Sequence, residues 1–173
     1  MAVAVVVLLA GYWFSLSTQY DLLPVGNPAP GFTLTAADGS RVSLAESARA
    51  GHAAILVFYP GDNTAVCTAQ LCALRDSWGT VQAAGADVYG INPASKAKHL
   101  DFARRNRYPF PLLVDADEAV SAAYGCRALG GLLKRTVYII GSDGRIAWAQ
   151  RGKPEISQIL AALGRAHRGK VVP

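Results

Sequence analysis

The hydrophobic pattern of the chain changes its period near residue 60, and this change predicts a strand followed by a helix. Residues 53–59 form a continuous apolar run, which is typical of a central strand covered on both faces. From Ala65 to about Ala84 apolar residues recur at helical spacing, and Gly85 stands where a helix would end. The residues of this apolar stripe are Leu71, Leu74, Trp78 and Val81. The pattern therefore predicts a buried strand that leads into one long helix.

The rest of the chain alternates between short strands and helices. Residues 32–35 and 42–44 alternate around Asp38-Gly39, which is typical of a small hairpin. The later segments predict, in order, a strand at 87–92, a helix at 95–107, a strand at 112–115, a helix at 118–124, an antiparallel pair of strands at 135–140 and 145–150, and a closing helix from Pro154 to about Arg165. This order predicts an α/β sandwich with a mixed sheet.

An apolar segment precedes these elements. Residues 2–16 are nearly all apolar, and the first charged side chain of the chain is Asp21. A helix of this length is about 24 Å long, shorter than the roughly 30 Å hydrocarbon core of a membrane. Ser15-Leu16-Ser17 would serve as a signal cleavage site, but no Lys or Arg precedes the segment. We therefore expect an export signal or a short membrane anchor, and a strand or helix buried in the core is the alternative.

These observations divide the chain into three parts. Residues 1–21 form the apolar N-terminal segment, residues 22–165 form one α/β domain, and residues 166–173 form a basic tail. We expect membrane association through residues 2–16 and a membrane-anchored or exported location, with a cytoplasmic location as the alternative.

Length and composition fit one folded domain. The chain has 173 residues, of which 51% are hydrophobic and 17% charged, so a wholly disordered chain is excluded. The net charge of +5 comes from scattered Lys and Arg, with dense clusters at residues 104–107 and 165–170. Neither cluster is interleaved with aromatic side chains that could stack on bases, so we predict no nucleic-acid partner.

The cysteines and histidines exclude several kinds of site. The three cysteines contain no Cys-x-x-Cys pair, so zinc-ribbon and thioredoxin-type redox motifs are missing. His52, His99 and His167 share no ligand spacing with one another or with the cysteines, and we expect them on the surface. We predict no metal and no cofactor.

Cys67 stands where a helix can activate a thiol. It lies in the first turn of the helix that follows residues 53–59, and the partial positive charge and free N–H groups of a helix N-terminus favour a thiolate. Thr64 can direct a hydroxyl toward the same pocket, and Pro60 offers a rigid apolar shield without an N–H donor. The residues predict a shielded, activated sulfur.

Residues 59–76 carry a resemblance to a known family. The spacing Pro60-x-x-x-Thr64-x-x-Cys67 resembles the active-site signature of peroxiredoxins, the alkyl hydroperoxide reductase and thiol-specific antioxidant family. Asp62-Asn63 and a second cysteine at Cys72 resemble the bacterioferritin-comigratory, or Q-type, subgroup. The resemblance extends from about Leu23 to Leu163 and implies a thioredoxin-like sandwich, with a central mixed β-sheet flanked by helices.

The resemblance implies a thiol peroxidase that reduces hydrogen peroxide and organic hydroperoxides. Cys67 would become a sulfenic acid, and Arg135 matches the active-site arginine that stabilises the thiolate and holds a peroxide oxygen. Gln70 occupies the polar position that follows the cysteine. Cys72 would resolve Cys67 as an intramolecular disulfide, which thioredoxin or a similar dithiol would reopen. We expect a monomer or a weak dimer.

The spacing of the two cysteines has a structural consequence. Positions five apart on a helix are separated by about 7.5 Å of rise and about 140° of rotation, so their sulfurs point in different directions. A direct bond is impossible in that geometry. If Cys72 resolves Cys67, the first turns of the helix must unwind in each cycle.

Other interpretations of these residues remain open. A membrane-tethered copper-delivery protein on the same scaffold would use two thiolates, but its Cys-x3-Cys spacing and distant His differ from this chain. A thiol-disulfide oxidoreductase would need the missing Cys-x-x-Cys. Cys72 could be a buried apolar residue, and Arg135 a surface strand residue. Cys126 is expected to be a bystander, although an exposed thiol there could compete for the sulfenic acid or link two chains. Asp62, Asn63 and Arg75 are predicted to be turn and helix-face groups without a chemical role.

Overall fold

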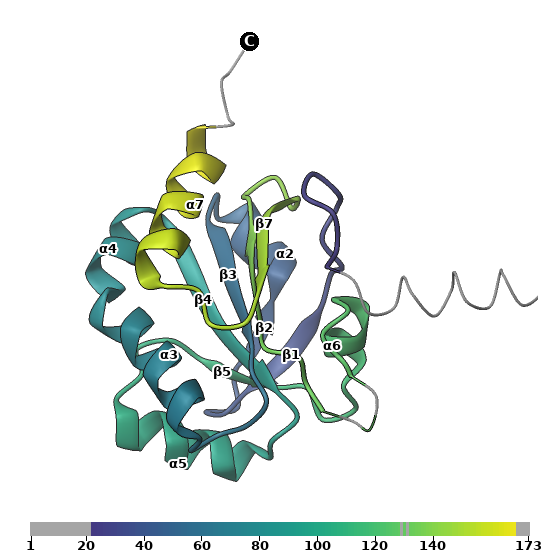
Figure 1. Ribbon diagram of the computed structural model, residues 1–173, viewed down its shortest axis with the longest axis vertical. Helices are drawn as coiled ribbons and strands as arrows, with labels where there is room; N and C mark the ends of the chain where they lie inside the picture. Colours follow the sequence, from purple (N-terminus) through teal and green to yellow (C-terminus); the bar gives the residue numbers. More distant parts are fainter. Residues whose placement is uncertain (1–21, 129, 131, 169–173) are drawn as a thin grey trace, which may run out of the picture.

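A mixed β-sheet forms the centre of the molecule (Figure 1). The computed structural model describes residues 22–128, 130 and 132–168. Within them the seven strands have the order β2-β1-β5-β4-β3-β6-β7. The strands are β1 (Thr33–Ala36), β2 (Arg41–Ser43), β3 (Ala53–Phe58), β4 (Ala86–Asn92), β5 (Leu112–Val114), β6 (Thr136–Ile140) and β7 (Ile146–Arg151). Strands β3, β4 and β5 are parallel, and the other pairings are antiparallel.

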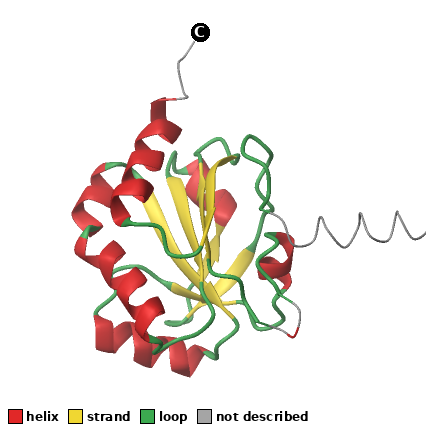
Figure 2. Cartoon of the chain, viewed as in Figure 1, coloured by secondary structure: helices red, strands yellow, loops and turns green. Residues whose placement is uncertain are grey.

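Helices cover both faces of this sheet (Figures 1 and 2). They are α2 (Leu44–Arg49), α3 (Ala65–Asp76), α4 (Trp78–Ala83), α5 (Lys96–Asn106), α6 (Ala119–Ala123) and α7 (Ile156–Arg168). Apolar side chains of α3, α4, α5 and α7 pack on one face, and those of α2 and the α6 region pack on the other. The predicted α/β sandwich with a mixed sheet is confirmed.

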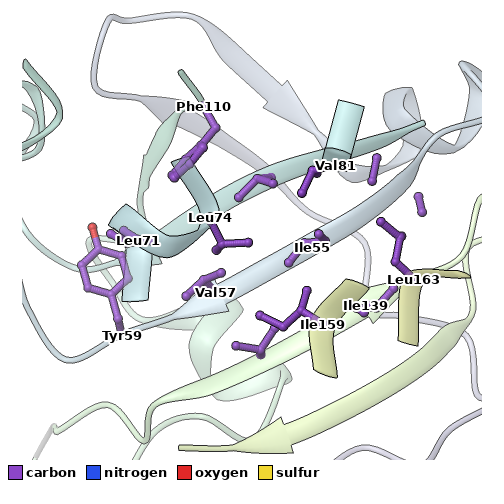
Figure 3. Packing of buried hydrophobic residues seen from close by; sticks show 14 of the residues in the cluster. Ile55, Val57, Tyr59, Leu71, Leu74, Val81, Phe110, Ile139, Ile159 and Leu163 are labelled. Atoms are coloured by element: carbon purple, nitrogen blue, oxygen red, sulfur yellow. The ribbon is translucent and has the colours of Figure 1, made fainter. Parts of the chain in front are cut away.

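Strand β3 supplies side chains to both halves of the core. Ile55 and Val57 point into the cluster under α3 and α7, together with Tyr59 just beyond the strand (Figure 3). Leu56 and Phe58 point to the opposite face. These five side chains are fully buried. The continuous apolar run at residues 53–59 is therefore a central strand with two covered faces, as the sequence predicts.

One predicted helix is wrong. The segment from Ala65 to Ala84 forms two helices, because α3 ends at Asp76 and α4 begins at Trp78. Ser77 between them has φ −99° and ψ 12°, outside the helical range. The apolar stripe continues across this break, since Leu74 before it and Val81 after it pack into the same cluster. Helical periodicity could not reveal the break for this reason.

Some predictions concern parts of the chain that the structure does not describe. The apolar segment within residues 1–21 lies outside the described residues, as does most of the basic tail at 166–173. Among the helices that are described, none has the length and hydrophobicity needed to cross a membrane. The export signal or membrane anchor stays a prediction, and so do the domain limits.

Candidate active site

The candidate site lies where the chain leaves β3 and begins α3. Thr64 is the N-cap of α3, with an extended backbone (φ −86°, ψ 143°), and its Oγ1 accepts a hydrogen bond from the backbone N–H of Cys67 at 3.3 Å. This bond satisfies one of the N–H groups that a helix start leaves without partners. Thr64 therefore fixes the first turn of α3, and with it the position of Cys67.

A guanidinium group meets the Cys67 sulfur. Arg135, just before β6, places Nη2 3.1 Å from Sγ of Cys67, and its Nη1 donates to Oε1 of Gln70 at 2.9 Å. Cys67 and Gln70 are buried, and Gln70 lies one turn further along α3. The structure thus brings Arg135 to Cys67 and Gln70, although it lies 65 or more residues further along the chain.

The electrostatics of this arrangement favour a negative sulfur. The positive charge of Arg135 and the partial positive charge of the α3 N-terminus both act on Sγ of Cys67, which has no exposed surface. A charged donor interacts more strongly with a buried acceptor than with one in solution. The same two groups would stabilise an oxygen that becomes negative beside the sulfur.

Pro60 has a different environment from the other site residues. It follows Tyr59 directly after β3, and its side chain is exposed. Its expected role as an apolar shield for Cys67 stays a prediction.

Cys72 lies on the same helix but faces another part of the molecule. Its thiol is half-buried, with Sγ 3.9 Å from the Tyr108 hydroxyl and 4.0 Å from Oδ1 of Asn106 at the end of α5. Cys67 and Cys72 are both free, and α3 is continuous between them. The structure therefore has the helical geometry that keeps the two sulfurs apart.

Cys126 is buried rather than exposed. Its Sγ donates to the Tyr124 carbonyl at 3.4 Å and lies 3.9 Å from Nη1 of Arg151. Burial raises the pKa of Cys126 to about 11, against the lowering effect of its hydrogen bonds and of Arg151. The alternative of an exposed Cys126 that competes for the sulfenic acid is therefore wrong for this folded chain.

The prediction for one histidine is also wrong. His52 is on the surface as expected, 3.3 Å from Asp87, and the side chain of His167 lies outside the described residues. His99, however, has no exposed surface, and its Nδ1 lies 2.9 Å from Oδ2 of Asp62. The side chain of Asp62 is 5% exposed, so this carboxylate is not a solvated turn group.

Asp62 is held by three donors. Its Oδ1 accepts from the Tyr59 hydroxyl at 2.9 Å and from Nδ2 of Asn92 at 3.0 Å, in addition to the His99 contact. Burial acts to raise the pKa of Asp62. The hydrogen bonds from His99, Tyr59 and Asn92, together with the charge interaction with His99, outweigh burial and hold the pKa of Asp62 below its usual range. Sequence reasoning missed this cluster, although His99 and the buried Phe102 share one face of α5.

Comparison with known proteins identifies the family. A family model described as AhpC/TSA matches residues 25–149. The chain belongs to the AhpC/TSA family. Among curated relatives, it is 37% identical over 141 residues to a Mycobacterium tuberculosis H37Rv protein provisionally named a peroxiredoxin, covering 77% of this chain and 88% of that one. It is 38% identical over 125 residues to chloroplastic peroxiredoxin Q of Oryza sativa subsp. japonica, covering 71% of this chain and 57% of the rice protein.

Solved structures of AhpC/TSA proteins share the fold. Peroxidoxin BcpB of Mycobacterium tuberculosis is 27% identical with a TM-score of 0.77, over 83% of this chain and 97% of that one. Peroxiredoxin Q of Xanthomonas campestris is 26% identical with a TM-score of 0.71, over 78% and 90% of the two chains. The thioredoxin-like fold and the resemblance to Q-type peroxiredoxins are confirmed. This AhpC/TSA protein is a peroxidase that acts on hydroperoxides at the expense of a thiol reductant.

Proposed function

We propose that Cys67 attacks the hydroperoxide, that Cys72 resolves the product as an intramolecular disulfide, and that thioredoxin or a similar dithiol restores both thiols. The observation that carries this proposal is the contact of 3.1 Å between Nη2 of Arg135 and the buried Sγ of Cys67, at the N-terminus of α3. Hydrogen peroxide and organic hydroperoxides are the proposed substrates, and the protein needs no cofactor or metal.

In the first step the Cys67 thiolate attacks one oxygen of the hydroperoxide. The S–O bond forms as the O–O bond breaks, so the sulfur is oxidised by two electrons and becomes a sulfenic acid. The departing oxygen takes a proton and leaves as water or an alcohol. Arg135, which lies 3.1 Å from the sulfur, and the positive end of the α3 dipole would stabilise the negative charge that develops on this oxygen.

In the second step the Cys72 thiol attacks the sulfenic sulfur of Cys67. The S–S bond forms and the hydroxyl group of the sulfenic acid leaves as water. The first turns of α3 must unwind for this reaction, because both cysteines lie on one continuous helix. Unwinding breaks the hydrogen bond between Thr64 and Cys67. We expect this conformational step to limit the rate of disulfide formation.

In the third step an external dithiol opens the Cys67–Cys72 disulfide. The dithiol becomes a disulfide and both cysteines return to thiols, so one turnover converts a hydroperoxide and a dithiol into an alcohol, water and a disulfide. Cys72 is half-buried even in the folded form, which supports approach of the dithiol to this sulfur. Membrane association through residues 2–16 and a monomeric or weakly dimeric state remain part of the proposal.

Thiol counting tests this proposal. The reduced chain has three thiols, and addition of one equivalent of hydrogen peroxide should remove two of them, while Cys67→Ser should show no rapid loss. A Cys67→Ser variant that loses thiols as fast as the wild type would contradict the assignment of Cys67. Titration with Cu(I) tests the copper-delivery alternative, which would gain support if Cys67 and Cys72 bound one ion tightly.

A further inference from the structure

The loop between β3 and α3 is tied to the rest of the molecule through Asp62. Figure 3 shows Tyr59 at the end of β3 with its ring beside Leu71 of α3. The Tyr59 hydroxyl donates to Asp62 at 2.9 Å, Nδ2 of Asn92 at the end of β4 donates at 3.0 Å, and Nδ1 of His99 on α5 lies at 2.9 Å. Asp62 therefore connects the loop to β4 and α5, and to Tyr59 at the start of the loop itself.

The contacts of Asp62 agree with an ionised carboxylate. Such a group only accepts hydrogen bonds, so Nδ1 of His99 and the Tyr59 hydroxyl act as its donors. Nε2 of His99 lies 3.4 Å from the Asn92 carbonyl oxygen, which also only accepts. Burial raises the pKa of Tyr59 well above its usual value, and the nearby Asp62 adds to this effect, so the phenol keeps its proton. Each partner is buried, which strengthens these hydrogen bonds.

Asp62 itself makes no hydrogen bond to the reacting sulfur, and of its three partners Tyr59 lies near enough to Cys67 to interact with it electrostatically. Among the described residues, the hydrogen bonds of Asp62 go to Tyr59, Asn92 and His99, whereas the Cys67 sulfur binds Arg135. Asp62 lies two residues before the Thr64 cap. The residue between them, Asn63, has a φ of 61°, a conformation that few non-glycine residues adopt without support from their surroundings. Asp62 thus connects to Cys67 through the loop and the Thr64 cap.

We propose that the Asp62–His99 pair is a positioning device that holds this loop and the first turn of α3 folded, and thereby sets the balance between peroxide attack and disulfide formation. This inference rests on the proposed function, in which attack needs the folded turn and disulfide formation needs it unwound. A stronger tether slows resolution and leaves the sulfenic acid exposed for longer to a second peroxide. That peroxide would oxidise it to a sulfinic acid and leave as water or an alcohol.

The proposal predicts that loss of the Asp62 tether changes the rate of disulfide formation and leaves the rate of peroxide attack nearly unchanged. A hydrogen bond to a charged group is worth about a tenfold change or more in an equilibrium constant. Asp62→Asn should therefore speed formation of the Cys67–Cys72 disulfide about tenfold or more, and raise the peroxide concentration for half-maximal sulfinic acid by a similar factor. The rate of peroxide attack should change by less than roughly twofold, because the folded turn remains the major form.

Rapid quenching with mass spectrometry measures all three species in one experiment. The wild type and Asp62→Asn are mixed with hydrogen peroxide, alkylated at set times, and scored for sulfenic acid, disulfide and sulfinic acid. Tyr59→Phe removes one donor to Asp62 and should give a smaller change in the same direction. Ser47→Ala is the matched control, because it removes a buried hydrogen bond of 2.6 Å to the hydroxyl of Tyr89, which packs on the opposite face of the sheet. This variant should leave the ratio of disulfide to sulfinic acid unchanged.

The outcomes separate this inference from the proposed function. A disulfide rate that changes less than about twofold in both Asp62→Asn and Tyr59→Phe would overturn it. A parallel fall in the rate of peroxide attack would also overturn it, because Asp62 would then act on the chemical step. If Asp62→Asn does not fold, Tyr59→Phe decides alone. A wild type that forms no Cys67–Cys72 disulfide would refute the proposed function itself, before any variant is compared.

Discussion

Removal of the Arg135 guanidinium should slow peroxide attack by a large and calculable factor. Nη2 of Arg135 lies 3.1 Å from Sγ of Cys67, and Nη1 is held at 2.9 Å from Gln70. A hydrogen bond between a charged donor and its acceptor contributes about 1.5–3 kcal/mol, and each 1.4 kcal/mol changes a rate about tenfold. Arg135→Met should therefore lower the rate about 10- to 100-fold.

The assay isolates the first step by using a Cys72→Ser background, in which no disulfide can form between the two positions. Stopped-flow or rapid-quench measurement then gives the second-order rate constant for oxidation of Cys67 by hydrogen peroxide. Arg135→Lys keeps the charge but loses the two-armed contact, so its rate should lie between those of Arg135 and Arg135→Met.

Arg75→Met is the matched control for Arg135→Met. Arg75 lies on α3, and its guanidinium binds the Asp76 carboxylate and, at 2.7 Å, the Asn106 carbonyl rather than the Cys67 sulfur. The control should react at the unaltered rate. A loss of less than about threefold in Arg135→Met would refute the reasoning, because the contact of 3.1 Å would then contribute little to the transition state.

Three further predictions follow from packing, burial and capping. Gly90→Ala places a Cβ 2.6 Å from Leu112 Cδ2, so the free energy of unfolding measured in urea should fall by about 1–3 kcal/mol. An unchanged urea midpoint would contradict this close packing. Cys126, whose pKa is raised to about 11 by burial, should stay protonated at pH 8 and resist iodoacetamide until the chain unfolds; rapid alkylation of the native protein would disagree. Thr64→Ala removes the hydrogen bond from the Cys67 N–H to the Thr64 hydroxyl, so the free energy of unfolding measured by thermal denaturation should fall by about 1 kcal/mol.

Sequence patterns predicted the parts of this protein that depend on local order. The continuous apolar run at 53–59 predicted a strand with two covered faces, and the helical spacing of apolar residues from Ala65 onward predicted the start of α3 with Cys67 in its first turn. The contact with Arg135 was reached only through the resemblance to peroxiredoxins. No local pattern connects residues 68 positions apart.

Two features could not be read from local patterns. The break at Ser77 leaves the apolar stripe intact, because α3 and α4 pack on the same face of the sheet. The burial of His99 depends on the meeting of two parallel strands, since β3 and β4 end at the same edge and bring Asp62 and Asn92 together there. A polar residue on α5 gives no sign of this until the neighbouring carboxylate is placed in space.

The central claim is that the Cys67 sulfur reacts with the hydroperoxide, and trapping of the first product tests it most directly. Cys72→Ser protein is treated with one equivalent of hydrogen peroxide in the presence of dimedone, and the modified residue is located by tandem mass spectrometry. The proposed function predicts a dimedone adduct on Cys67, since the sulfenic acid formed there has no resolving partner. An adduct confined to Cys126, or peroxide consumption without any adduct on Cys67, would contradict it.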